Sequence, residues 1–134
     1  MAGLAHVRLE QRVLDLLEIQ SMDLAAISLH KARQAYDQVQ EPVLVMDGGF
    51  YIDGLNGFPA AYTHDMLETV GIAMIAKIAS VLEDKGCSFR SVATYITGPD
   101  TYQQFCDTTG DVFVLSDRVW PHDHPKQWSP LWRM

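Results

Sequence analysis

Apolar and polar residues follow one another along the chain with two different spacings, and these spacings predict alternating strands and helices. Residues 6–14 alternate in the manner of a partly exposed strand. After Asp23, which suits the N-cap of a helix, apolar residues recur every three or four positions to about Gln38. Pro42 then ends the helix, and the apolar run at residues 43–46 predicts a strand that is buried on both faces.

Two further helices are predicted after a turn-rich segment at residues 53–59. Residues 62–68 suit a short helix, Gly71 interrupts it, and residues 72–82 suit a second helix with a polar, glycine-terminated exit. The apolar face of this second helix is formed at helical spacing by Ile72, Ile75, Ile78, Ala79 and Leu82.

The rest of the chain predicts strands that are joined by tight turns. Residues 89–96 and 102–106 suit a hairpin around a turn at residues 98–100. A second turn at residues 109–111 leads into a strand at residues 112–115. This order of elements predicts an α/β domain with a central β-sheet flanked by helices, and the hairpins imply that the sheet is mixed.

Length, charge and cysteine content narrow the class of protein. The 134 residues, of which 48% are apolar, suit a single domain over residues 1–134. A formal net charge of −7 argues against nucleic acid or an anionic membrane as the main partner. No apolar run reaches the length of a membrane span and no signal-peptide layout is present, so we expect a cytoplasmic protein. Cys87 and Cys106 have no metal-binding spacing and are expected to be free thiols.

Candidate chemistry follows directly after the apolar run at residues 43–46. Asp47 is followed by the pair Gly48-Gly49, and a glycine pair allows the backbone to turn. The turn would place the Asp47 carboxylate at the end of a buried strand, where ions and ligands are often bound. The alternative is that the carboxylate only caps the turn through its own side chain.

The segment from Trp120 to Met134 has an unusual composition, with three prolines and three tryptophans. Such a segment cannot form a regular helix, and we expect its aromatic residues to pack on the domain or on a partner. His122-Asp123-His124 has no third ligand nearby in the sequence, so simple surface residues are expected there rather than a transition-metal site.

Four segments together carry a resemblance to a known family. They are residues 15–20, 27–32, 42–49 and 53–59, which include Asp15-Leu16-Leu17-Glu18-Ile19-Gln20 and Asp53-Gly54-Leu55-Asn56-Gly57-Phe58-Pro59. In this order and spacing the chain resembles the inosine triphosphate pyrophosphatase family, also called Ham1-like. The resemblance covers nearly all of the chain and is strongest from residue 15 to residue 67.

The resemblance implies a two-lobed α/β fold, a homodimer and a magnesium-dependent hydrolysis of inosine or xanthosine triphosphates to the monophosphate and pyrophosphate. Glu18 matches a magnesium-binding glutamate of the family, and Lys31 matches a lysine that contacts the phosphates. Asp47 matches the acid that binds the metal and activates the attacking water. We therefore expect Glu18 and Asp47 to lie close enough to share one Mg²⁺, a small hard cation that prefers carboxylate oxygens.

Three further positions are expected to contact the substrate by the same resemblance. His64 matches a basic substrate contact, Trp128 lies at the base-recognition position, and Gly48 follows the catalytic acid. The predicted partner is thus a purine nucleoside triphosphate, with Mg²⁺ as the cofactor.

The chain also departs from the family pattern. Met46 replaces the first acid of the acidic pair, Gly48 replaces a serine or threonine, and Pro59-Ala60 replaces a proline-glycine pair. The chain starts at what resembles the family's second strand, without the phosphate-binding loop, and the closing lysine and serine-histidine-arginine motifs are not found. Two functions therefore stay open: a pyrophosphatase with slow turnover, and an inactive relative that binds nucleotide or dimerises.

Overall fold

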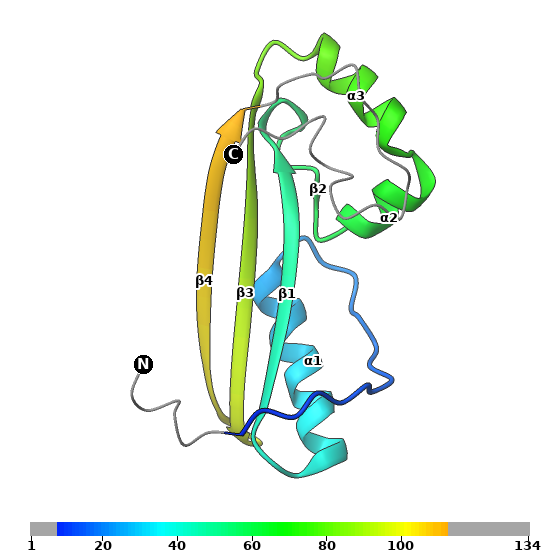
Figure 1. Cartoon of the computed structure of the whole chain (residues 1–134). Coiled ribbons are helices and arrows are strands. Elements are labelled where there is room, and N and C mark those ends of the chain that lie inside the picture. The colour runs from blue at the N-terminus through cyan, green and yellow to red at the C-terminus, as the bar shows by residue number, and fades with distance from the viewer. Residues whose placement is uncertain (1–7, 113–134) are drawn as a thin grey trace.

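The computed structural model describes residues 8–112. Its strands form one sheet, and its helices pack beside this sheet (Figure 1). The elements are, in chain order, α1 (Leu24–Val39), β1 (Val43–Ile52), the short 3₁₀ helix η2 (Asp53–Leu55), β2 (Pro59–Ala60), α2 (Thr63–Thr69), α3 (Ile72–Val81), β3 (Gly86–Gly98) and β4 (Thr101–Val112).

The sheet has the strand order β2-β1-β3-β4. β1 pairs with β3 over its whole length, from Val43 opposite Ile96 to Ile52 opposite Cys87, and β3 continues into β4 as a long hairpin. The predicted α/β class and the hairpin are confirmed. A mixed sheet was expected, and among the described residues all three strand pairs are antiparallel.

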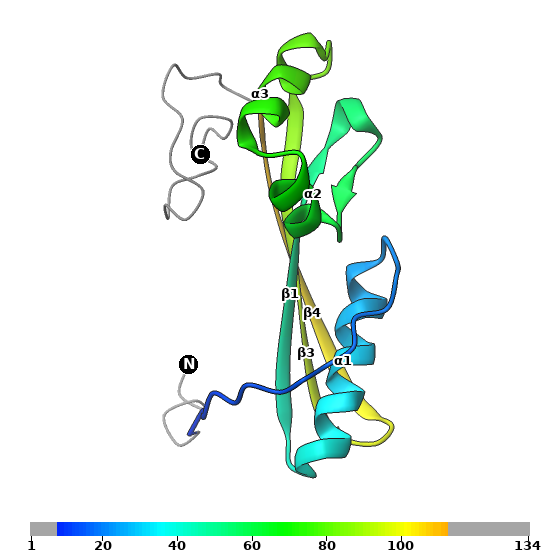
Figure 2. The ribbon, with the colours of Figure 1, turned by 90° about the vertical axis from the view of Figure 1, so that its right-hand side faces the viewer.

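The helices divide the sheet into two halves (Figures 1 and 2). α1 lies beside one half of the long strands, and α2 and α3 lie beside the other half. Successive side chains of a strand point to opposite faces. Asp47 therefore points to the face that α1 contacts, whereas Phe50 and Ile52 point to the opposite face and pack in the core of α2 and α3.

α1 begins and ends as its sequence predicts. The Asp23 carboxylate accepts a hydrogen bond from the Ala25 backbone at 3.0 Å, which caps the first turn. Gln40 adopts a left-handed conformation with φ of 54° and ends the helix. The buried face of the helix consists of Leu24, Ile27, Ser28, Ala32 and Ala35. This face packs on β1 and β3 and forms the core of the first half.

A small polar network holds α1 against β3 and β4. The hydroxyl groups of Ser28 and Thr94 lie 2.7 Å apart, and both residues are fully buried. The Gln104 amide donates to the Thr94 hydroxyl at 3.0 Å and to the Ala25 carbonyl at 2.8 Å. Because buried polar groups are costly unless they are paired, this network fixes the position of α1 on the sheet.

α2 and α3 form the second core with the far ends of β1 and β3. Its buried residues are Phe50, Ile52, Met66, Ile72, Ile75, Ala79 and Cys87. The two helices predicted at residues 62–68 and 72–82 are confirmed, with Gly71 between them at a φ of 83°. Ile78 and Leu82, predicted on the apolar face of α3, are partly buried against this core.

The prediction of a turn after Asp47 is wrong, because β1 continues through the glycine pair. Neither glycine has a positive φ, so the pair does not serve to bend the chain. A side chain at Gly49 would overlap the carbonyl oxygen of Ala60. The absence of a side chain at Gly49 therefore permits the close approach of the neighbouring strand β2, and Asp47 lies in the middle of β1.

Two other predicted elements are also wrong. Residues 8–14 form no strand and are mostly exposed, because their alternation breaks at Gln11-Arg12 and they make no ladder with β1. No turn occurs at residues 109–111, because β4 stays paired with β3 up to Val112 opposite Gly86. The predicted strand at residues 112–115 and the tail from Trp120 lie largely outside the described residues.

Two of the broader expectations can be compared with the described part of the chain. Cys87 is buried and Cys106 is exposed, and the two are not joined in a disulfide, as predicted. Among residues 8–112 no helix is long and apolar enough to cross a membrane.

A substitution at Gly49 tests the close approach of β2. We expect Gly49→Ala to destabilise the fold by about 1–3 kcal/mol, because the new methyl group meets backbone atoms that cannot move aside easily. Gly110→Ala is the matched control, since the nearest atom to its new methyl group is 4.0 Å away. Urea unfolding of both variants measures the difference, and equal stabilities would contradict the packing argument.

Candidate functional site

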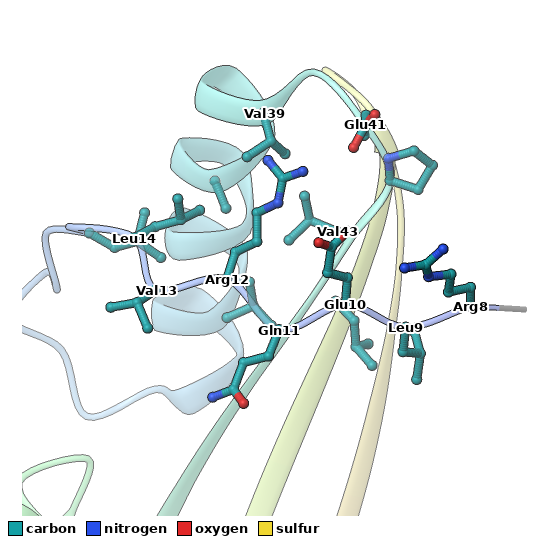
Figure 3. Close-up of a pocket in the computed structure, with 15 residues that line it drawn as sticks. Arg8, Leu9, Glu10, Gln11, Arg12, Val13, Leu14, Val39, Glu41 and Val43 are labelled. Atoms are coloured by element: carbon teal, nitrogen blue, oxygen red, sulfur yellow. The ribbon is translucent and has the colours of Figure 1, made fainter.

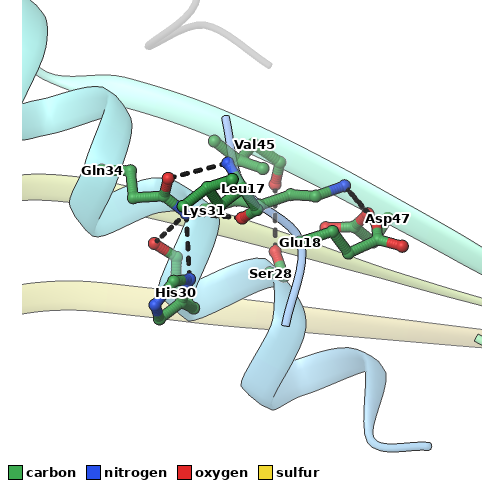
Figure 4. Close-up of polar contacts among 8 residues, drawn as sticks. All are labelled: Leu17, Glu18, Ser28, His30, Lys31, Gln34, Val45 and Asp47. Carbon is green, nitrogen blue, oxygen red and sulfur yellow. Dashed lines mark hydrogen bonds and ion pairs between the residues drawn. The ribbon is translucent and has the colours of Figure 1, made fainter. Parts of the chain in front are cut away.

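The ammonium group of Lys31 lies between two carboxylates that come from different parts of the chain (Figure 4). Its Nζ is 2.6 Å from Glu18 Oε1 and 2.8 Å from Asp47 Oδ1. The exposed fractions of the side chains are 20% for Lys31, 12% for Asp47 and 47% for Glu18. The cluster is therefore largely closed on the side of the sheet and open to solvent on the side of Glu18.

Gln34 holds the irregular segment that carries Glu18 against α1. Its amide group exchanges two hydrogen bonds with the backbone of Leu17, at 2.8 Å and 2.6 Å. The Gln34 nitrogen also lies 2.9 Å from Nδ1 of His30, one helical turn earlier (Figure 4). This clamp fixes the residue next to Glu18, so Glu18 can reach Lys31 although its segment has no regular structure.

Asp47 keeps one oxygen without a partner. Its Oδ1 accepts from Lys31, whereas its Oδ2 is buried and has no hydrogen bond to any described residue. On the neighbouring strand Asp47 lies opposite Val92, which is itself buried and apolar. A buried carboxylate oxygen without a partner is unfavourable, and such groups often mark a bound ion or a catalytic position.

The charge of Lys31 is secured by its neighbours. Burial alone lowers the pKa of Lys31, but hydrogen bonds and charge attraction from Asp47 and Glu18 outweigh it, so the pKa lies above the usual 10.5. Lys31 is therefore a cation at every physiological pH.

The structure brings three of the six sequence-predicted site residues together and leaves His64 and Gly48 outside the cluster. Glu18 and Asp47 both contact one nitrogen, so their bonded oxygens are closer together than the sum of those two short distances. The His64 side chain on α2 is 82% exposed and lies 3.9 Å from Glu68. Gly48 is exposed, and a side chain there would point to Phe89 on the face opposite Asp47. Trp128 lies outside the described residues.

The two carboxylates fit a magnesium ion that is completed by its substrate. No group of three or more metal-ligating side chains occurs within residues 8–112, so this part of the chain holds no all-protein cage. Mg²⁺ is commonly held by one or two carboxylates together with substrate phosphates and water. Glu18 and the unpaired oxygen of Asp47 match that donor set.

One pair near this cluster was missed by sequence analysis. The guanidinium group of Arg90 lies over the ring of Tyr51, 4.1 Å from its centroid. Burial raises the pKa of Tyr51, the charge of Arg90 opposes this shift, and Asp23 at the start of α1 adds to it. Arg90 is a lone base in an otherwise weakly polar strand, which is a signal in the sequence, but only the strand register reveals its neighbours.

A cavity of about 680 Å³ lies beside the C-terminal half of α1 and the start of β1 and does not include the cluster. It is bounded by residues 8–14 and Leu16, by Ala35 and Val39 of α1, and by residues 41–45 at the start of β1 (Figure 3). Lys31, Glu18 and Asp47 are absent from its lining, so the cavity and the candidate site are separate features.

The curated proteins that the chain resembles are named as pyrophosphatases of inosine or xanthosine nucleotides. The chain is 37% identical over 105 residues to inosine triphosphate pyrophosphatase 2 of Trypanosoma cruzi. The matched stretch covers 76% of the chain and 54% of the relative. It is 35% identical over 85 residues to a dITP/XTP pyrophosphatase of Hyperthermus butylicus, and this matched stretch covers 63% of the chain and 45% of the relative. The chain thus spans about half the length of the curated relatives it matches.

Solved structures show the same fold. The Ham1 protein of Staphylococcus aureus superposes with a TM-score of 0.70 at 17% identity, over 88% of the chain and 62% of that protein. A HAM1 protein of Coxiella burnetii superposes with a TM-score of 0.71 at 16% identity, over 87% of the chain and 63% of that protein. A family model described as the Ham1 family matches residues 2–114. The chain belongs to the Ham1 family.

Proposed function

We propose that the protein is a nucleoside triphosphate pyrophosphatase that hydrolyses non-standard purine nucleotides such as ITP, dITP and XTP to the monophosphate and pyrophosphate. Relatives with these activities in their names support the substrate class. The observation that carries the proposal is the arrangement of Glu18 and Asp47 around one ammonium group, with a buried oxygen of Asp47 that accepts no hydrogen bond from residues 8–112.

Each residue of the cluster has a role in this proposal. Glu18 and Asp47 would hold a magnesium ion, and Asp47 also orients and deprotonates the attacking water. Lys31 uses two of its three N–H donors on the carboxylates, which leaves the third for a phosphate oxygen. Magnesium, when bound, would supply the positive charge that stabilises the phosphate oxygens as the bond breaks.

The alternative function is nucleotide binding without efficient turnover. It is favoured by the small number of cations at the site, because Lys31 is the sole base that contacts the two carboxylates among the described residues. Phosphoryl transfer needs the triphosphate to be held in line with the water while charge develops, which normally takes several donors. Binding could persist with fewer of them. The expectation of a cytoplasmic location stays a prediction under either function.

Acid-to-amide substitutions test the roles of the two carboxylates. We expect magnesium-dependent release of pyrophosphate from ITP, and we expect Asp47→Asn to lower it about 100-fold or more because a charged group at the reaction centre is lost. Glu18→Gln should lower it less, since this side chain is half exposed. Glu83→Gln, at an exposed position in the loop after α3, is the matched control and should retain full activity.

The assay measures pyrophosphate with ITP, XTP and ATP, with and without magnesium. Unchanged activity in Asp47→Asn would remove Asp47 from the reaction centre. If no pyrophosphate appears, but ITP binds and Asp47→Asn weakens that binding, the alternative function replaces the first.

We also propose that two copies of the chain associate through the sheet face opposite α1. Leu44, Met46, Tyr95 and Phe105 are 46%, 67%, 42% and 57% exposed. The register places Leu44 opposite Tyr95, and places Met46 and Phe105 on either side of Ala93, so these side chains form one continuous apolar patch. A patch of this kind on a protein surface marks an interface more often than free surface.

A charge placed in this apolar patch tests the homodimer. We expect the protein to be a dimer at micromolar concentration and Met46→Lys to weaken association at least about tenfold, because the ammonium would lose water at the interface. Val81→Lys changes another exposed apolar residue, at the end of α3, and should leave the dimer intact. Sedimentation analysis distinguishes the species. A monomeric wild-type protein, or equal effects of both variants, would contradict the proposed interface.

A further inference from the structure

We propose that Arg90, held over Tyr51, binds the phosphate chain of the nucleotide at the Glu18, Lys31 and Asp47 cluster. The inference rests on the proposed function and adds a residue that the sequence analysis did not select. It is carried by the strand register, by the stacking of the guanidinium group and by the lack of an acidic partner for it within residues 8–112.

The strand register places Arg90 next to Asp47. Val92 lies directly opposite Asp47, and Arg90 lies opposite Gly49, two positions further along. Diagonal neighbours on one face of an antiparallel pair are about 7–8 Å apart, which long side chains can span. Gly49 carries no side chain, so no β1 side chain stands between Asp47 and Tyr51 on this face. Arg90 therefore lies on the same face of the sheet as Asp47, as its diagonal neighbour, with its guanidinium group over Tyr51.

Stacking on Tyr51 orients the guanidinium group without using its donors. A cation over an aromatic ring is attracted by the face of the ring, and the N–H groups at its edge stay available. Arg90 is exposed, and within residues 8–112 it makes no ion pair with a carboxylate. Lys31, in contrast, already contacts two carboxylates. Arg90 is therefore the cation near the site whose donors are free for an incoming anion.

The charge balance of the site favours a further cation beside the magnesium ion of the proposed function. The two carboxylates exceed the charge of Lys31 by one, and the whole chain carries a net charge of −7. A triphosphate would be repelled by this field unless local cations offset it. A planar guanidinium group offers paired donors that match phosphate oxygens, which makes arginine well suited to this position.

A second arginine–tyrosine pair provides a matched control. Arg33 of α1 lies 5.6 Å from the centroid of the Tyr102 ring of β4. Tyr102 lies opposite Ile96, four positions along β3 from Val92, the residue opposite Asp47. Arg33 has the same charge and the same type of contact as Arg90. Arg33→Ala therefore removes the same charge and the same type of ring contact as Arg90→Ala, but away from the cluster.

The experiment measures binding of ITP, IMP and inorganic tripolyphosphate to the full chain by titration calorimetry, with magnesium present. We expect Arg90→Ala to weaken binding of ITP and tripolyphosphate about tenfold or more, and to weaken IMP binding less. Arg90→Lys should recover part of the loss, because it restores the charge and not the paired donors. Arg33→Ala should bind all three ligands as the wild-type protein does. Thermal unfolding of each variant confirms that it is folded.

Lys31→Ala separates this inference from the proposed function. If Lys31→Ala weakens ITP binding and Arg90→Ala does not, the role of Arg90 is wrong and the site itself stands. The role of Arg90 would also be wrong if Arg90→Ala weakened the binding of ITP and IMP equally. The same holds if Arg90→Ala and Arg33→Ala weakened ITP binding equally. The proposed function fails if the wild-type protein does not bind ITP and Lys31→Ala does not change the binding of any ligand.

Discussion

The structure of the site depends on one ammonium group that neutralises two carboxylates. Lys31 joins α1 to the middle of β1 through Asp47 and to the irregular segment before α1 through Glu18. The two contacts differ in weight. The contact with half-exposed Glu18 resembles a surface ion pair and contributes little to stability, whereas loss of the contact with Asp47 would leave a buried carboxylate without a counter-charge. Lys31 therefore makes a carboxylate at this depth possible, and the free oxygen of Asp47 is the consequence that links the fold to chemistry.

The two faces of the central strands carry different features of the molecule. On the face that α1 contacts, alternation and register place Asp47, Tyr51 and Arg90 on the same side of the sheet, and Lys31 contacts Asp47. On the other face, the far half of β1 carries the core of α2 and α3, and the near half carries the exposed apolar patch that we assign to a second copy. The uninterrupted course of β1 through Gly48-Gly49 is what holds these regions in a fixed relation, because a turn there would separate Asp47 from Tyr51.

Local patterns in the sequence predicted the helices well and the strands less well. Helical periodicity, the Asp23 cap and Gly71 defined α1, α2 and α3 to within a residue or two, because these signals act over a few neighbouring positions. The glycine pair after Asp47 was misread, since the reason for Gly49 is the Ala60 carbonyl, which only tertiary structure brings near. The proximity of Glu18, Lys31 and Asp47 was expected from family resemblance alone. Arg90 was missed because its relation to Asp47 exists only through the pairing of β1 with β3.

The most direct test of this account is a crystal structure of the protein with Mn²⁺ in place of Mg²⁺ and a non-hydrolysable analogue of inosine triphosphate. The anomalous signal of the metal locates it without reference to activity. We predict one strong metal peak within about 2.2 Å of Asp47 Oδ2, with Glu18 as a second protein ligand or bound to it through water. Clear density for the nucleotide phosphates, with the metal and the phosphates away from Asp47, Glu18 and Lys31, would contradict the central claim that this cluster is the metal and phosphate site.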